Sequence, residues 1–407
     1  MKIEGFFKDV TGASRVTKAR RQLIEHGDPN NIYRDHIKDL ANELHPSRTE
    51  VVVTKVEDVS PTARKFTFEA KEGYKLPPFQ AGQYVSLDLK IDGTLTTRPY
   101  SICSAPYQAR TGEHPFFEIT VRNGRPGQGF ASSWLYANVR EGMNFTVHLP
   151  FGWLYYEPLR DAKHIVALAG GSGITPFYSM AQEIAHGTLD ADLTILYGSQ
   201  NTKDIILVKQ LNEVENSCDR VRFVNVISNE PEYEGEKGFL SADLIRKYSN
   251  GQDCTYFVCG PLPMYNFVAG ELKKLNVPER RIRFELFGAP RDVTKAVGYN
   301  GHTTEVKPYA GDPDKVWKLT VCRGIHEDVI EAKASEPIAV ALERAGIPNN
   351  TRCRSGACGY CRCQLLDGEV FIPNTGDGRR YADKKFGYVH ACSTWPLSDI
   401  KIRLAIK

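Results

Sequence analysis

The sequence predicts a multidomain chain with an antiparallel β-barrel, a parallel-sheet α/β domain, a small α+β domain and a short helical N-terminal extension. Three observations lead to this prediction. Short β-type segments separated by Gly and Pro turns begin at Glu50, strand-like and helical runs alternate from about residue 160, and five cysteines fall between residues 353 and 392. The expected boundaries are 1–49 for the extension, 50–158 for the barrel, 159–287 for the α/β domain, 288–314 for a linker and 315–407 for the last domain.

The composition is that of a globular protein. Hydrophobic residues make up 41% of the 407 residues, and 52 Lys and Arg against 49 Asp and Glu leave a net charge of +3. These values exclude a disordered chain and a strongly basic nucleic-acid binder. No apolar run is long enough for a membrane span, and the charged N-terminus has no apolar signal core. We therefore expect a cytoplasmic protein without a membrane span.

The N-terminal extension carries one clear helical pattern. Asp28-Pro29 is a typical helix start, apolar residues follow at helical spacing as far as Leu44, and Pro46 ends the run. The segment is too small for a robust core of its own. We expect it to pack either on the barrel or on a partner protein.

The two large domains differ in their hydrophobic patterns. In the first, turns such as Asp92-Gly93 and Glu141-Gly142 separate short strands, as in an antiparallel barrel. Its expected strands include 51–53, 65–69, 84–89, 116–121 and 145–149. The second alternates strands with helices, which indicates a parallel sheet. Its expected strands are 164–169, 193–197, 222–226 and 255–259, and its expected helices include 177–185 and 262–275.

Four cysteines near the C-terminus have the spacing of an iron–sulfur site. Cys353, Cys358, Cys361 and Cys392 form C-x4-C-x2-C with a fourth cysteine after thirty intervening residues, which is the plant-type 2Fe–2S pattern. Small residues and glycines in this loop allow backbone amides to turn toward the sulfurs. Residues 315–407 thus resemble the plant-type ferredoxins, which implies a β-grasp fold and these four metal ligands. A four-cysteine zinc site is the alternative, and Cys363 is expected to be a packed thiol.

The C-terminal domain is unusually basic for this resemblance. Residues 315–407 contain fifteen Lys and Arg against ten Asp and Glu, whereas photosynthetic ferredoxins are usually acidic. The basic residues include Arg352, Arg354 and Arg362 near the cluster, with Arg379, Arg380, Lys384 and Lys385 beyond it. They favour either a partner with an acidic surface or compensation of the cluster's own negative charge.

A flavin site is indicated in the barrel. Arg98-Pro99-Tyr100-Ser101 resembles the R-x-Y-S signature of the ferredoxin–NADP reductase family. The resemblance implies that Arg98 pairs a flavin phosphate, Tyr100 packs on the flavin ring and Ser101 lies near its reactive N5 atom. Gly129 and Ser132 fit the family's G-x-x-S-x-x-L segment, where a helix start binds the flavin phosphates, and the turn 150–152 fits its P-x-G. These features favour FAD over FMN.

A nicotinamide site is indicated in the α/β domain. The turn 170–176 follows a strand and opens a helix, which places backbone N–H groups beside a phosphate. It shares the family's G-x-G-x-x-P form, which implies nucleotide contacts by Gly171, Gly173, Thr175 and Pro176. The family's C-G-P is present as Cys259, Gly260 and Pro261, with the cysteine expected beside the nicotinamide. Glu285 and Phe287 match an acidic residue and an aromatic near the flavin. The nucleotide is NADH or NADPH; Gln200 replaces an Arg common in NADPH enzymes, which favours NADH.

The motif order resembles a flavin reductase of the ferredoxin–NADP reductase superfamily fused to a C-terminal 2Fe–2S domain. It implies an NAD(P)H oxidoreductase with Ser101, Cys259 and Glu285 as catalytic residues. Electrons would pass from NAD(P)H to the flavin, then singly to the cluster and on to a partner protein such as an oxygenase or another reductase. Two alternatives remain open: a fixed electron-input subunit of a larger redox complex, and a non-catalytic redox sensor.

Overall fold

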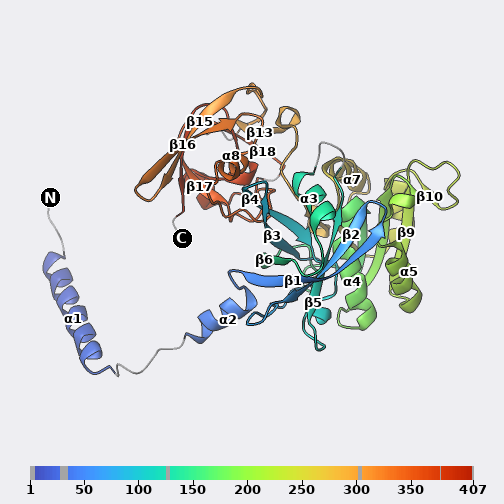
Figure 1. The fold of residues 1–407 in the computed structure, drawn as a ribbon, viewed down its shortest axis with the longest axis horizontal. Coiled ribbons are helices and arrows are strands. Elements are labelled where there is room, and N and C mark those ends of the chain that lie inside the picture. The colour runs from blue at the N-terminus through green and yellow to red at the C-terminus, as the bar shows by residue number, and fades with distance from the viewer. Residues whose placement is uncertain (1–4, 28–34, 125–128, 301–304, 376, 406–407) are drawn as a thin grey trace. The chain divides into compact units, whose positions relative to one another are not determined.

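The computed structural model describes residues 5–27, 35–124, 129–300, 305–375 and 377–405 (Figure 1). The chain divides into two compact units, Met1–Leu44 and His45–Lys407, which are described separately. In the first unit, α1 spans Phe6–Glu25 and α2 spans His36–Leu44, so the extension is helical as predicted. The predicted helix start at Asp28-Pro29 lies outside the described residues. Ile37 and Leu40 of α2 are exposed. Within the described ranges, no helix is long and apolar enough to cross a membrane.

The second unit begins with a six-stranded antiparallel sheet in the order β4-β3-β6-β1-β2-β5, which confirms the predicted barrel domain. Its core is filled by inward-facing aromatic and aliphatic side chains such as Phe66, Phe117 and Leu87. The elements are β1 (Thr49–Ser60), β2 (Ala63–Ala70), β3 (Tyr84–Ile91), β4 (Thr94–Ser101), β5 (Phe116–Arg122), α3 (Phe130–Asn138) and β6 (Asn144–Phe151).

The next sheet has the order β10-β9-β8-β7-β11-β12 and is parallel, as predicted. Alternate residues of β7 enter two cores, one shared with α4 and α5 and the other with α6 and α7, so helices cover both faces. The strands are β7 (His164–Gly170), β8 (Asp192–Ser199), β9 (Val221–Ile227), β10 (Glu236–Lys237), β11 (Cys254–Cys259) and β12 (Ile282–Glu285). The helices are α4 (Thr175–His186), α5 (Val208–Ser217), α6 (Ala242–Ser249) and α7 (Leu262–Lys274).

Helix α4 joins these two domains. Ser179 Oγ donates a hydrogen bond to Ser104 O at 2.6 Å, and the Tyr107 N–H donates to Glu183 Oε1 at 2.9 Å. Barrel residues such as Leu154 also belong to the hydrophobic core beneath α4. The barrel and the parallel sheet therefore form one packed body.

The C-terminal domain has two small sheets, ordered β16-β15-β21-β17-β19 and β14-β13-β18-β20. Strands β15 and β21 pair in parallel while α8 packs its apolar side on the first sheet, as expected for a β-grasp fold. The elements are β13 (Val297–Asn300), β14 (Val306–Pro308), β15 (Val316–Arg323), β16 (His326–Lys333), α8 (Ile338–Arg344), β17 (Arg362–Asp367), β18 (Val370–Pro373), α9 (Tyr381–Lys385), β19 (Tyr388–His390), β20 (Trp395–Pro396) and β21 (Ile400–Leu404). Short 3-10 helices include η2 (Gly171–Ile174), η4 (Glu279–Arg281) and η6 (Ala391–Ser393).

The segment 288–314, expected as a linker, contains two strands. β13 pairs with β14 and also with β18 of the C-terminal domain. A Cβ on Gly298 would lie 2.0 Å from Ile372 O, so glycine is required for this close approach. Strands of three and four residues give no readable alternation, which is why the sequence pattern indicated a linker.

Candidate functional site

The four predicted cluster cysteines come together in the C-terminal domain. Cys353, Cys358 and Cys361 lie in the loop between α8 and β17, and Cys392 lies in η6. The Cys358 and Cys392 side chains lie next to the Cys353 sulfur, and their proximity, followed by the polar groups of Ser355, lowers the pKa of Cys353. Cys392 also lies within hydrogen-bonding distance of Cys361. All of these cysteines are buried except Cys358, which is half-buried.

Backbone N–H groups point at these sulfurs. The amides of Ser355 and Cys358 each donate to Cys353 Sγ at 3.4 Å, and that of Gly356 donates to Cys392 Sγ at 3.3 Å. Gly356 has a φ of 80°, a conformation that residues with side chains rarely adopt. Such amide donors stabilise the negative charge that a cluster places on its sulfurs.

This donor set fits a 2Fe–2S cluster. A 2Fe–2S cluster takes four cysteine thiolates as its ligands, which is the number that this loop and η6 supply. Cys363 lies on β17 in the hydrophobic core of the domain.

The predicted flavin motif lies on β4, at one edge of the barrel sheet. Because side chains alternate along a strand, Arg98 and Tyr100 lie on one face and Ser101 on the other. Arg98 Nη1 donates to Thr97 O at 2.7 Å. Burial, together with the nearby guanidinium of Arg354, lowers the pKa of Arg98 to about 10. A phosphate beside Arg98 would offset this penalty, so the residue fits its expected role.

Gly129 and Ser132 lie at the start of α3. Gly129 is the N-cap residue with a φ of 78°, and Ser132 Oγ donates to its carbonyl oxygen at 3.1 Å. Helix α3 packs against β3 and β5 of the barrel. Its first-turn N–H groups have the chemistry to bind a phosphate.

The predicted nucleotide turn lies at the carboxyl end of β7. Gly171 and Gly173 belong to η2, and Thr175 and Pro176 begin α4. A Cβ on Gly173 would lie 2.0 Å from Cys259 O. Glycine therefore allows the turn to approach the end of β11, which lies beside β7 in the sheet.

The C-G-P segment is next to this turn. Cys259 ends β11 and is 2% exposed, and Pro261 is the N-cap of α7. Gly260 lies beside Gly170, since a Cβ on it would meet Gly170 N at 3.3 Å. Burial, with a smaller effect from the Glu285 carboxylate, raises the pKa of the Cys259 thiol. The thiol is therefore neutral at physiological pH and suits contact with a ligand ring better than nucleophilic attack.

Tyr84 connects the flavin motif to the end of the α/β domain, and the sequence pattern missed it. It lies opposite Ser101 in the β3–β4 ladder, and its ring contacts that of Phe287 at 5.3 Å between centroids. Glu285 is on β12 opposite Cys259, and its Oε2 is buried without a hydrogen-bond partner among the described residues. Burial, followed by the charge of the nearby Cys353, raises the pKa of Glu285. The three predicted catalytic residues thus lie at one junction, close to the cluster loop.

The cluster loop packs directly on the barrel. Thr97 Oγ1 donates to Thr351 O at 2.8 Å, and Arg352 Nη2 lies 3.3 Å from His148 Nδ1. The ring of Tyr360 contacts that of Phe151 edge-on at 5.2 Å. These contacts connect β4 and β6 with the loop that holds the cysteines. Arg352 and Arg354 are buried here, so they do not belong to the basic surface considered for a partner.

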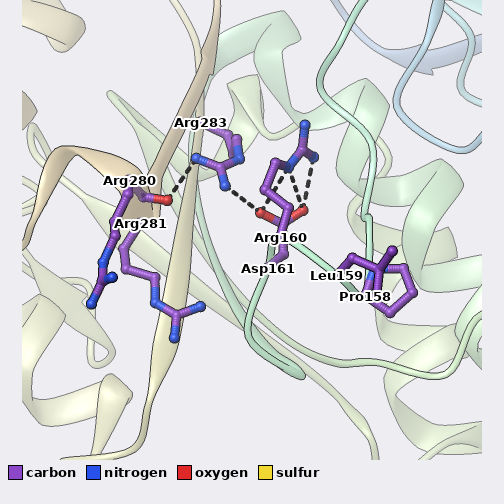
Figure 2. A pocket seen from close by; sticks show the side chains of 7 residues that line it. All are labelled: Pro158, Leu159, Arg160, Asp161, Arg280, Arg281 and Arg283. Carbon is purple, nitrogen blue, oxygen red and sulfur yellow. Dashed lines mark hydrogen bonds and ion pairs between the residues drawn. The ribbon is translucent and has the colours of Figure 1, made fainter.

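A separate pocket of about 650 Å³ is rich in arginine (Figure 2). Arg283 and Arg160 both contact the buried carboxylate of Asp161, and Arg281 pairs with Asp253. The pocket lies at the amino ends of β7 and β12, whereas the glycine turn, Cys259 and Glu285 lie at the carboxyl ends. It is therefore not part of the candidate site, because parallel sheets bind their ligands at the carboxyl ends of the strands.

Comparison with protein families agrees with this geometry. Models of an oxidoreductase FAD-binding domain, an oxidoreductase NAD-binding domain and a 2Fe–2S cluster binding domain match residues 50–156, 167–270 and 325–397. The glycine betaine monooxygenase reductase subunit of Chromohalobacter salexigens is 28% identical over 89% of this chain and 95% of its own. The ferredoxin reductase component of 3-ketosteroid-9-alpha-monooxygenase from Mycobacterium tuberculosis is 27% identical over 86% and 94%.

The structure also resembles that of phthalate dioxygenase reductase, with a TM-score of 0.62, 20% identity, and coverage of 88% of this chain and 98% of that one. The three domains, their order and the converging cysteines identify an NAD(P)H oxidoreductase that binds FAD and a 2Fe–2S cluster. The chain belongs to the ferredoxin–NADP reductase superfamily, as a flavin reductase with a C-terminal 2Fe–2S domain.

Proposed function

We propose that this protein is the reductase component of an oxygenase system and takes its electrons from NADH. The observation that carries the proposal is the packing of the cluster loop on β4 and β6, beside Tyr84 and Glu285. The NADH site, the flavin site and the cluster site are then neighbours within one packed unit, in the order in which electrons pass. Relatives named as reductase components of monooxygenases support the choice of acceptor.

We assign the flavin to the barrel residues. Arg98 binds a phosphate, Gly129 and Ser132 present the first turn of α3 to the phosphates, and Tyr100 covers the ring. Ser101 lies at the reactive end of the ring. When bound, FAD converts a two-electron hydride into single electrons, and a 2Fe–2S cluster carries these one at a time.

The nucleotide is assigned to the carboxyl ends of β7 and β11. Gly171, Gly173, Thr175 and Pro176 place N–H groups and the start of α4 at its phosphates. Cys259, Gly260 and Pro261 lie against the nicotinamide. Burial raises the pKa of Glu285, and with Phe287 this residue excludes water from the junction. Cys353, Cys358, Cys361 and Cys392 hold the cluster.

We propose that the acceptor presents an acidic surface to α9. A Cβ on Gly378 would lie 2.6 Å from Gly356 O, so the chain leading into α9 packs on the cluster loop. Tyr381 and Phe386 are exposed to 81% and 59% beside exposed cations. An apolar centre with a cationic rim suits transient docking of an anionic protein. The α9 patch comprises Arg380, Tyr381, Lys384, Lys385 and Phe386.

Anaerobic titration with NADH and then NADPH tests the proposal, with flavin and cluster absorbance as readouts and an electron paramagnetic resonance sample at the endpoint. We expect stoichiometric NADH to bleach both centres. Bleaching by NADPH alone would overturn the choice of donor. A flavin that responds while the cluster stays oxidised would contradict the relay, and a silent flavin would contradict the site assignment.

A second candidate is a fixed electron-input subunit of a larger complex, and the helical N-terminal unit favours it. The apolar side chains of α2 are exposed, including Ile37 at 81%, and a permanent partner would cover them. Size-exclusion chromatography of native extract separates the two candidates, because a free component elutes near 45.6 kDa and a fixed subunit elutes with its complex. For either candidate we place the protein in the cytoplasm, whose reducing conditions suit its free cysteines.

A further inference from the structure

Arg354 lies in the cluster loop but directs its side chain at the flavin motif. Its Nη1 lies 3.4 Å from both Thr96 Oγ1 and Thr97 O on β4. Arg98 Nη1 donates to the same two oxygens. Two guanidinium groups from different domains therefore share one pair of acceptors.

Two guanidinium groups and one carboxylate meet at this contact. Arg354 makes a two-point ion pair with Glu343 of α8, at 2.5 Å and 3.1 Å, and the two residues are 9% and 7% exposed. Among the described residues, no carboxylate forms an ion pair or a hydrogen bond with Arg98, because Glu343 pairs with Arg354. Within this contact one carboxylate thus faces two cations, Arg354, which is buried, and Arg98, which is half-buried. The cluster thiolates add negative charge on the Arg354 side, so Arg98 is the cation without an anion of its own at this contact. A half-buried cation of this kind favours an anion bound beside it.

We propose that Arg354 forms part of the flavin phosphate site, so that the ferredoxin domain helps to hold the flavin of the barrel domain. This inference rests on the proposed role of Arg98. The phosphate that Arg98 binds supplies the missing negative charge, and Arg354 adds a second cation to its surroundings. Glu343 positions Arg354 and limits the total positive charge.

The arrangement couples two events. Flavin binding removes the repulsion between Arg98 and Arg354, and it thereby favours the docked position of the cluster loop on β4. Coupling of this kind is reciprocal, so docking of the ferredoxin domain must strengthen flavin binding by the same factor. A reductase built in this way favours a docked cluster when its flavin is in place.

The test measures dissociation constants of the reconstituted full-length apoprotein for FAD and for riboflavin, by quenching of flavin fluorescence. Arg354→Gln should weaken FAD binding about tenfold, the loss expected for one charge-assisted interaction. It should leave riboflavin binding unchanged, because riboflavin has no phosphate. Glu343→Gln should strengthen FAD binding. The neutral pair R354Q/E343Q retains hydrogen-bonding groups and should bind FAD more tightly than Arg354→Gln but more weakly than the wild type. It covers the case in which Glu343→Gln alone does not fold.

Two further variants keep the outcomes distinct. Arg344→Gln, which changes an exposed arginine of α8 that pairs with Glu336, is the matched control and should bind FAD normally. Arg98→Gln tests the proposed function itself: normal FAD binding by this variant would overturn that assignment. If Arg98→Gln loses FAD while Arg354→Gln binds it normally, only the present inference is wrong. Equal weakening of FAD and riboflavin by Arg354→Gln would also overturn it, as a general distortion of the site.

Discussion

At the scale of single residues, the site depends on close approaches that few side chains permit. Gly173 lies against the peptide that joins Cys259 to Gly260, and a Cβ there would be 2.0 Å from one atom and 2.7 Å from another. No real Cβ tolerates such distances, and backbone cannot rotate away as a side chain can. The glycine turn can therefore pack against the C-G-P segment only because residue 173 has no Cβ atom.

Gly173→Ala should consequently separate the turn from β11. We expect a loss of nucleotide affinity of at least about tenfold and a lower melting temperature, since overpacking typically costs about 1–3 kcal/mol. Nucleotide titration and thermal unfolding measure the two effects. Gly270→Ala is the control, because nothing lies within 4 Å of a Cβ at that helical position in α7; it should be neutral or slightly stabilising. Equal behaviour of the two variants would contradict the role of Gly173.

His164, at the start of β7, gives the stability a pH dependence. Burial lowers its pKa below the ordinary value of 6.5, while the charge of Asp192 opposes the shift. The unfolded chain then takes up a proton at a higher pH than the folded one. The contribution of neutral His164 to the free energy of unfolding is complete above pH 6.5 and is lost as the pH falls through the lowered pKa. We expect His164→Gln to lose less unfolding free energy than the wild type between pH 7.5 and 5, measured by urea denaturation. Parallel curves for the two proteins would refute this origin.

At the scale of elements, the length of a segment decided what the sequence could predict. The strands expected at 65–69, 84–89, 116–121 and 145–149 lie within β2, β3, β5 and β6, because each carries enough alternating residues to indicate a half-buried strand. β13 and β14 are too short for such a pattern, and their pairing with β18 is set by tertiary contacts. The sequence pattern likewise gives no indication of helix α9, although Lys384 and Lys385 stand among the basic residues near the cluster. It is five residues long, and its surface becomes a candidate docking site only because the chain leading into it packs on the cluster loop.

The α9 patch should govern electron transfer to charged proteins. We expect R380E/K385E to accelerate reduction of a basic cytochrome c and to invert its salt dependence, so that added salt slows the variant and speeds the wild type. Stopped-flow or steady-state rates at several ionic strengths measure this. Lys273→Glu with Arg280→Glu makes the same charge change at exposed positions of the α/β domain and should leave the salt slope nearly unaltered. An unchanged slope for the α9 variant would place the exit site elsewhere.

At the scale of the whole molecule, the sequence predicts which residues form the flavin, nucleotide and cluster sites, but not how the three sites contact one another. Gly and Cys spacings are local, so motifs could place the flavin, nucleotide and cluster residues on the chain. The contacts of Tyr84 with Phe287 and of Arg354 with Thr97 join residues that are hundreds of positions apart or in different domains. They depend on how the domains pack, which no spacing records. The packing brings the cysteines beside the carboxyl end of the parallel sheet, and this adjacency makes the three domains one oxidoreductase.

The order of the domains predicts which activities survive loss of the cluster. Cys392→Ala removes one of four sulfurs, one that accepts a hydrogen bond from Gly356, and should prevent cluster assembly, as seen in iron content and visible absorbance. Because the flavin and nucleotide residues lie in the other two domains, NADH should still reduce the flavin, and reduction of ferricyanide should persist. Reduction of cytochrome c should fall more than tenfold, since its electrons must pass through the cluster.

Cys363→Ala is the matched control, because that thiol is 0% exposed in the core of the same domain. It should keep the cluster and both activities at a cost of about 1 kcal/mol in stability. A cluster retained in Cys392→Ala, or lost in Cys363→Ala, would show that the four ligands have been assigned wrongly. Cytochrome c reduction that survives without a cluster would mean that the flavin, and not the C-terminal domain, is the point from which electrons leave.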